Sequence, residues 1–136
     1  MVYSFKYDVS IRFRHPTMNP EEICEKLGLQ ALHKWLAGTQ RKTPKGVLLE
    51  GVYEESYCTF KLEPSKDYGL IDFLTYCNQN FCSYKEFFEK IRLTGGSIEY
   101  FIGLYFDKNG GEIFDWKLLS QLGELKIDLS LDFYPS

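Results

Sequence analysis

Residues 3–14 read YSFKYDVSIRFR, and this stretch decides the fold. Apolar and polar residues alternate along it, the apolar set being Tyr3, Phe5, Tyr7, Val9, Ile11 and Phe13. Successive side chains of a strand point to opposite faces of a sheet, so the pattern predicts one long strand with a dry face and a polar face. His15-Pro16 is expected to end it, because proline cannot donate a hydrogen bond to the ladder.

Further strands are predicted by the same alternation. Residues 97–106 and 125–133 both place an apolar residue at every second position, from Ile98 to Phe106 and from Leu125 to Phe133. Residues 46–53, GVLLEGVY, predict another strand. Residues 56–62, SYCTFKL, are predicted to pair with 46–53 as a hairpin, although the sequence leaves open whether they form a separate strand.

Four segments have helical spacing or capping signals. Residues 19–28 begin with Asn19 as a cap and Pro20 in the first turn, and Gly28 is expected to end that helix. Residues 67–78 and 84–92 follow, the second behind a Ser-x-x-Glu capping box. Residues 116–122 form the last predicted helix, capped by Asp115 and ended by Gly123.

The order of these elements predicts an α+β fold, specifically a ferredoxin-like sandwich. Two βαβ halves, residues 3–62 and 97–134, would form one antiparallel sheet with helices on one face. Residues 65–93 would be a helical insertion between the halves. The expected strand order places 125–133 beside 3–14, and 3–14 beside 97–106. A length of 136 residues fits one domain over 1–136.

Composition excludes several classes of protein. The net charge is −3, whereas a domain that binds nucleic acid usually carries a basic excess. The longest apolar run, Tyr100 to Phe106, is far below the roughly 20 residues that span a bilayer. The N-terminus has no secretory pattern, so we expect a cytoplasmic protein without membrane attachment.

The sequence offers little for catalysis or for metal binding. Cys24, Cys58, Cys77 and Cys82 are expected to be reduced, buried and inert, without a metal site. His15 is expected to be a solvent-exposed residue at a strand end. Phosphate-binding glycine loops and nucleophile elbows are missing from the sequence. We therefore expect no cofactor and no catalytic residues.

Two groups of residues are candidates for binding. The polar face of the predicted sheet carries Arg12, Arg14, Phe101 and Tyr105, which could bind a ligand or partner. Cross-strand ion pairs beside two half-covered aromatic rings would explain the same residues.

The second candidate is the loop that combines Trp35 with Arg41 and Lys42. Loops held by a rigid scaffold often carry function. In the alternative interpretation, Trp35 plugs the end of the core while the basic residues stay solvated.

Short motifs also resemble those of a bacterial family, domain of unknown function 4279. They are Pro20-Glu21-Glu22-Ile23 leading to Leu27-Gly28-Leu29, Trp35 to Gly38, Leu122-Gly123, and the closing strand from Ile127-Asp128 to Tyr134. The resemblance covers about residues 3–134. It implies a bacterial α+β domain with no established activity, and it supplies no catalytic residues.

We therefore expect a small non-catalytic protein-interaction module, with an immunity-like protein that neutralises a basic enzyme as one form of it. A regulatory domain that binds a small ligand is the first alternative, and a hydrolase with a deep pocket is a weaker one. A homodimer that covers the polar sheet face is also compatible with the sequence.

Overall fold

The computed structural model describes residues 6–106 and 109–135. Within these residues the α+β class is confirmed, because runs of strands and pairs of helices follow one another along the chain. The elements are β1 (Lys6–His15), α1 (Pro20–Leu27), β2 (His33–Trp35), β3 (Gln40–Lys42), β4 (Leu48–Val52), β5 (Ser56–Leu62), α2 (Leu70–Phe81), a 3₁₀ turn (Cys82–Tyr84), α3 (Lys85–Leu93), β6 (Ser97–Phe106), α4 (Trp116–Leu125) and β7 (Asp128–Pro135).

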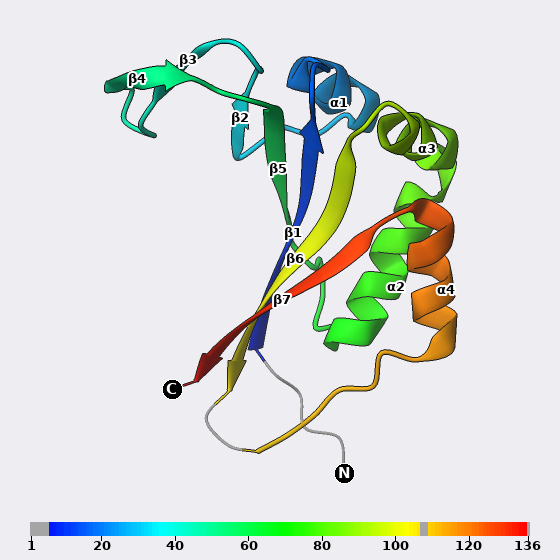
Figure 1. Cartoon of the computed structure of the whole chain (residues 1–136). Coiled ribbons are helices and arrows are strands. Elements are labelled where there is room, and N and C mark those ends of the chain that lie inside the picture. Colours follow the sequence, from blue (N-terminus) through cyan, green and yellow to red (C-terminus); the bar gives the residue numbers. More distant parts are fainter. Residues whose placement is uncertain (1–5, 107–108, 136) are drawn as a thin grey trace.

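Five strands form one sheet in the order β2-β5-β1-β6-β7, with β1 at its centre. β5 and β6 both run antiparallel to β1, while β7 runs parallel to β6. The four helices of the described residues lie on one side of this sheet, and the other side has no helix (Figure 1). A separate two-stranded ribbon, β3 with β4, projects from the corner near β2.

The predicted ferredoxin-like strand order is wrong. Because β5 and β6 pair with the two edges of β1, no edge of β1 is left for the last strand, which pairs with β6. The second half is a βαβ unit, since α4 connects the parallel strands β6 and β7. In the first half, α1 connects β1 with β2, which run in the same direction because both are antiparallel to β5; β5 lies between them, so this βαβ unit is split. The sheet is therefore mixed rather than antiparallel.

The predicted hairpin between 46–53 and 56–62 is also wrong. Residues 56–62 do form a strand, β5, but it pairs with β1 and β2. β4 pairs with β3 instead. The chain therefore leaves the sheet after β2, makes the ribbon, and returns to the sheet as β5 (Figure 1).

The predicted capping residues define both ends of α1, whereas packing extends α4 beyond its predicted end. Asn19 Oδ1 accepts a hydrogen bond from the Glu21 N–H at 3.0 Å, and Gly28 ends α1 at φ 66°. Gly123 does not end α4 as predicted. The helix continues to Leu125, which extends the buried stripe of Leu118 and Leu122 and so offsets the roughly 1 kcal/mol cost of an internal glycine.

The core lies between the sheet and the helices, and a series of side-chain hydrogen bonds crosses it. Tyr100 of β6 is fully buried, and its hydroxyl donates to Asn78 Oδ1 of α2 at 2.8 Å. Asn78 Nδ2 donates in turn to Gln121 Oε1 of α4 at 2.9 Å. Because buried polar groups must be paired, these two consecutive hydrogen bonds fix α2 and α4 relative to the sheet. Burial also raises the pKa of Tyr100 well above its usual value.

Candidate functional site

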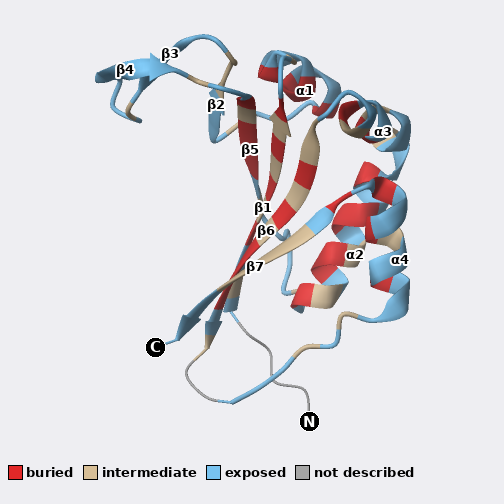
Figure 2. Ribbon diagram, in the orientation of Figure 1, coloured by how far each residue is buried: buried red, intermediate tan, exposed pale blue. Residues whose placement is uncertain are grey.

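The candidate site is the open face of the sheet, the side that the helices do not cover. β1 alternates between the two sides: Val9, Ile11 and Phe13 are buried under the helices, whereas Arg12 and Arg14 are half-buried on the open face (Figure 2). The register places Arg12 beside Glu99 of β6 and Thr59 of β5. The expected division into a dry face and a polar face is confirmed from Lys6 onward, whereas Tyr3 and Phe5 of the predicted strand lie outside the described residues.

Arg12, Phe101 and Glu99 form the centre of the open face. The Arg12 guanidinium carbon lies 3.6 Å from the centre of the Phe101 ring, which is a close cation–π contact. Arg12 NH1 is also 3.6 Å from Glu99 Oε1. Arg12 Nε is buried and has no hydrogen-bond partner among the described residues. The guanidinium is therefore held by stacking and by one carboxylate, although its donors are not all used.

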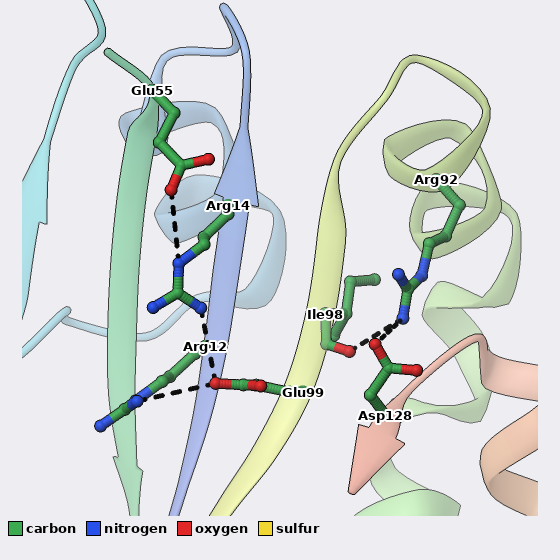
Figure 3. A network of polar contacts seen from close by, with 7 residues as sticks. All are labelled: Arg12, Arg14, Glu55, Arg92, Ile98, Glu99 and Asp128. Carbon is green, nitrogen blue, oxygen red and sulfur yellow. Dashed lines mark hydrogen bonds and ion pairs between the residues drawn. The ribbon is translucent and has the colours of Figure 1, made fainter. Parts of the chain in front are cut away.

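Arg14 extends this network toward β5. Its NH1 lies 3.4 Å from Glu99 Oε1 and its Nε lies 3.4 Å from Glu55 Oε1, so Glu99 holds two arginines at once (Figure 3). The Arg14 guanidinium also lies over the Tyr57 ring at 5.1 Å. These cations are ordered by aromatic rings and carboxylates of three different strands or loops.

Trp35 continues the series at the edge of the sheet. Its ring stacks on Tyr57 at 4.5 Å and on Tyr53 at 4.7 Å, so both of its faces are covered by tyrosines. The sequence left two interpretations of Trp35 open, a binding loop or a plug for the core. Trp35 lies in β2 opposite Tyr57 and is half-buried within an aromatic stack on the open face.

Tyr105 lies on the same face at the opposite end of the sheet. It stacks on Tyr134 of β7 at 5.0 Å, beside Gly103, where a Cβ would come within 3.3 Å of the Tyr134 ring. The Tyr105 hydroxyl donates to Asp8 Oδ2 at 2.8 Å, and that of Tyr134 donates to Asp132. Each of these hydrogen bonds to a carboxylate raises the pKa of its tyrosine.

Arg41 and Lys42 lie on the ribbon, outside the open face of the sheet. Both are exposed on β3 of the ribbon, where Arg41 NH1 donates to the Glu50 carbonyl at 3.3 Å. A cavity of about 850 Å³ lies where the ribbon meets the sheet, and its lining includes Trp35, Arg41, Glu54 and Glu55. The structure thus places Arg12, Arg14, Phe101, Tyr105 and Trp35 on the open face, with Tyr105 and Trp35 at opposite ends of it. It places Arg41 and Lys42 on the ribbon, where Arg41 lines the same cavity as Trp35.

Several residues of this surface are missing from the sequence-based candidates. Tyr53 and Tyr57 enclose Trp35, Glu55 holds Arg14, and Tyr134 stacks on Tyr105. Tyr57 alternates with the buried Cys58 in β5, so a firm prediction of that strand would have placed Tyr57 on the face opposite to Cys58. Its pairing with Arg14 follows only from the order of the strands. Asp128, expected beside β1, instead pairs with Arg92 of α3 at 3.0 Å (Figure 3).

His15 is buried rather than exposed, which corrects the expectation for the strand end. Its Nδ1 accepts hydrogen bonds from the backbone N–H groups of Thr17 at 3.0 Å and Met18 at 2.8 Å. Nε2 is 2.7 Å from Thr94 Oγ1, whose hydroxyl donates to the Lys90 carbonyl. Burial lowers the pKa of His15, and Glu22 opposes this shift. His15 therefore closes the turn after β1 as a neutral ring.

The cysteines are partly as predicted. Cys24, Cys58 and Cys77 are buried, and burial raises the pKa of Cys58 and of Cys77 to about 12, so neither is a reactive thiolate. Cys82 is exposed, contrary to expectation, because the 3₁₀ turn between α2 and α3 directs it outward. The described residues contain no group of three His, Cys, Asp or Glu side chains placed to hold a metal ion.

Comparison with family models, with curated proteins and with solved structures finds no match to this chain. The resemblance to domain of unknown function 4279 therefore stays a prediction. None of the helices in residues 6–106 and 109–135 is long and apolar enough to cross a membrane.

Proposed function

We propose that this protein is a small non-catalytic interaction module that binds another protein through the open face of its sheet. The observation that carries the proposal is the ordered series of arginines and aromatic rings on that face, from Phe101 and Arg12 to Arg14, Tyr57 and Trp35. Arginine, tyrosine and tryptophan are the residue types most enriched among interface hot spots.

The geometry supports binding because these side chains are already positioned. Ordering a flexible side chain at an interface costs about 0.5–1.5 kcal/mol, and the contacts of Arg12 and Arg14 meet part of that cost before binding. A purely structural role would not explain this ordering, because surface ion pairs contribute only about 0–1 kcal/mol to stability. The immunity-like form of the proposal, in which the partner is a basic enzyme, rests on the net charge of −3 of the whole chain, while the arginines of the open face are themselves paired with Glu99 and Glu55. Membership of the 4279 family is part of the same proposal and rests on the short motifs alone.

The test is capture from a lysate of the source cells with matched variants. Wild-type protein and Lys85→Glu, a control on the exposed surface of α3, should recover the same stoichiometric partner. Arg12→Glu should lose it, because the reversed charge would face Glu99 and no longer stack on Phe101. Equal recovery by Arg12→Glu, or repeated failure to recover any stoichiometric partner with wild type, would contradict the proposal.

A further inference from the structure

The outer edge of β7 is the longest strand edge that the described residues leave unpaired. β2 and β7 are the two edge strands of the large sheet, and β2 has three residues whereas β7 has eight. β7 pairs with β6 in an unbroken parallel register that reaches Pro135, and no described strand lies on its other side (Figure 1). The backbone groups on that side are therefore open to pairing with a further strand.

β7 lacks the features by which edge strands usually avoid pairing. Such strands are often very short, interrupted by a bulge or a proline, or protected by lysine. β7 is regular, contains neither lysine nor arginine, and has a proline only at its last residue, Pro135. Its charged residues are Asp128 and Asp132. Opposite charges stabilise a pair of strands and like charges destabilise it, so this edge favours a basic strand over an acidic one.

Apolar surface remains uncovered on the helix-covered side of this edge. Leu129, Leu131 and Phe133 lie on that side, because their partners in β6 are buried beneath the helices. Leu129 and Leu131 are half-buried and Phe133 is 59% exposed, although the residues they pair with are at most 4% exposed. Leu131 and Phe133 also line a cavity of about 400 Å³. Apolar side chains of an added strand would therefore bury this row.

The open side of the same edge carries carboxylates. Asp132 lies beside Gly103 of β6, and Asp8 of β1 lies on the other side of the same glycine. The Asp8 carboxylate accepts a hydrogen bond from the Tyr105 hydroxyl, and that of Asp132 accepts one from the Tyr134 hydroxyl. Neither carboxylate forms an ion pair with a described residue. Two aspartates without a paired cation therefore lie in one row that ends at the free edge.

The other charges around β7 do not offset these two aspartates. Lys6 lies on the same side of β1, two residues before Asp8, and offsets at most one of them. Glu112, which lines the cavity, adds a carboxyl group on the covered side. The remaining charged residues balance one another, in ion pairs or by number: Asp128 with Arg92, Glu55 and Glu99 with Arg12 and Arg14, and Asp115 and Glu124 with Lys117 and Lys126 at α4. The described residues around β7 therefore have a net negative charge.

We infer that β7 binds an extended segment of another protein, which becomes the sixth strand of the large sheet. A lysine or arginine of this segment lies beside Asp132, and the apolar residues before and after it pack against Leu131 and Phe133. In this mode of recognition the backbone hydrogen bonds give affinity and the alternating side chains give specificity. The inference goes beyond the proposed function, because the segment extends the sheet in its own plane and does not use the arginines and rings of the open face.

A second copy of this chain fits the same edge less well. When two β7 strands pair with all helices on one side, Asp128 and Asp132 of both copies share the open side, and β7 has no basic residue to pair with them. The pair centred on Ser130 places Asp128 of each copy opposite Asp132 of the other. If one copy is turned over, its aspartates lie beside the leucines of the other instead. Both arrangements are less favourable than pairing with a basic and apolar segment.

The experiment titrates a synthetic peptide of alternating valine and lysine, acetyl-VKVKVKV-amide, into the intact protein by calorimetry. Wild type should bind it, because the apolar and basic side chains alternate as this edge requires. Asp132→Lys should raise the dissociation constant about tenfold or more, because like charges then face each other. This variant should instead bind the peptide VEVEVEV, which wild type should not bind. Glu89→Lys, on the exposed surface of α3, has the same change of charge and should behave as wild type.

Two further readouts on wild type separate strand pairing from simple attraction between charges. The N–H groups of residues 128–135 should exchange more slowly with solvent when the lysine peptide is added. The same peptide methylated on two consecutive central backbone nitrogens should not bind, because neighbouring N–H groups of a strand point to opposite edges and both edges then lose a donor. Absence of binding to wild type, equal binding of the methylated peptide, or an unchanged affinity of Asp132→Lys would overturn the inference.

The test also distinguishes the other possible occupant and the proposed function. Slower exchange of residues 128–135 as the protein concentration rises, in the absence of peptide, would overturn the inference in favour of a second copy. The proposed function fails on a different result, which is equal capture of a partner by wild type and by Arg12→Glu.

Discussion

The two faces of the central sheet are made by the same strands and differ in almost everything else. On the covered face, Ile11 and Phe13 are 0% and 1% exposed and contact side chains from the helices. On the open face, Arg12 lies between them in sequence and Arg14 follows Phe13, and both arginines are held by carboxylates and aromatic rings. The comparison teaches that one alternating pattern can determine both the core and a binding surface. Covered-face residues should govern stability, and open-face residues should govern binding.

The largest effect expected is that of Phe13→Ala, set against Phe101→Ala on the open face. Phe13 is buried in edge-to-face contacts with Phe60 at 5.8 Å and Phe88 at 5.6 Å. Its truncation should lower the free energy of unfolding by about 3–5 kcal/mol, through lost burial and the cavity left behind. Phe101→Ala loses a half-exposed ring and one cation–π contact and should cost at most about 2 kcal/mol. Urea unfolding of both variants measures the difference, and equal losses would remove the distinction between the faces.

The covered face was largely predictable because its signals are local. The alternation at 6–15 and 97–106, the cap at Asn19 and the left-handed Gly28 all depend on residues near one another in sequence. The two helices predicted at 67–78 and 84–92 are also found close to those positions, as α2 and α3. Each of these features is decided by side-chain periodicity or by a single turn.

The order of the strands was not predictable in the same way. No local feature of residues 125–133 indicates whether that strand pairs with β1 or with β6, because β1 and β6 have the same alternating apolar face. The wrong strand order also affected the prediction of the contacts on the open face. Arg12, Arg14, Phe101 and Tyr105 share a face in either order, so their grouping was correct. The contacts of Arg14 with Tyr57 and Glu55 depend on β5 beside β1, so they were missed.

The second test of the comparison between the two faces concerns His15, a buried polar residue on the covered side. Its titration should make the stability of the protein depend on pH. His15 has a lowered pKa in the folded protein, so the unfolded chain binds more protons between that value and the ordinary value of about 6.5. Stability should therefore be complete above pH 6.5 and decrease as the pH falls through the folded pKa. A proton on Nδ1 would orphan two backbone N–H donors, and leaving such buried donors unpaired costs about 1–3 kcal/mol.

The measurement is urea unfolding from pH 7 to pH 5 for wild type and His15→Asn. The asparagine carbonyl can accept from the Thr17 and Met18 N–H groups but does not titrate in this range. The variant should therefore show a flatter dependence on pH than wild type. Parallel curves for the two proteins would mean that His15 does not contribute to this loss.

The smallest effect is expected at Glu99, the carboxylate that holds both arginines of the open face. Glu99→Gln keeps the size of the side chain and removes the charge, so the contacts with Arg12 and Arg14 weaken to ordinary hydrogen bonds. Because these groups are partly solvated, the loss of unfolding free energy should stay below about 1 kcal/mol. The difference from wild type should shrink further in high salt, which screens exposed charges. A loss comparable to that of Phe13→Ala would show that the open face supports the fold as strongly as the core does. A small loss of stability combined with a large loss of partner capture would instead mean that Glu99 orders the arginines for binding, which is the difference between the two faces that the structure implies.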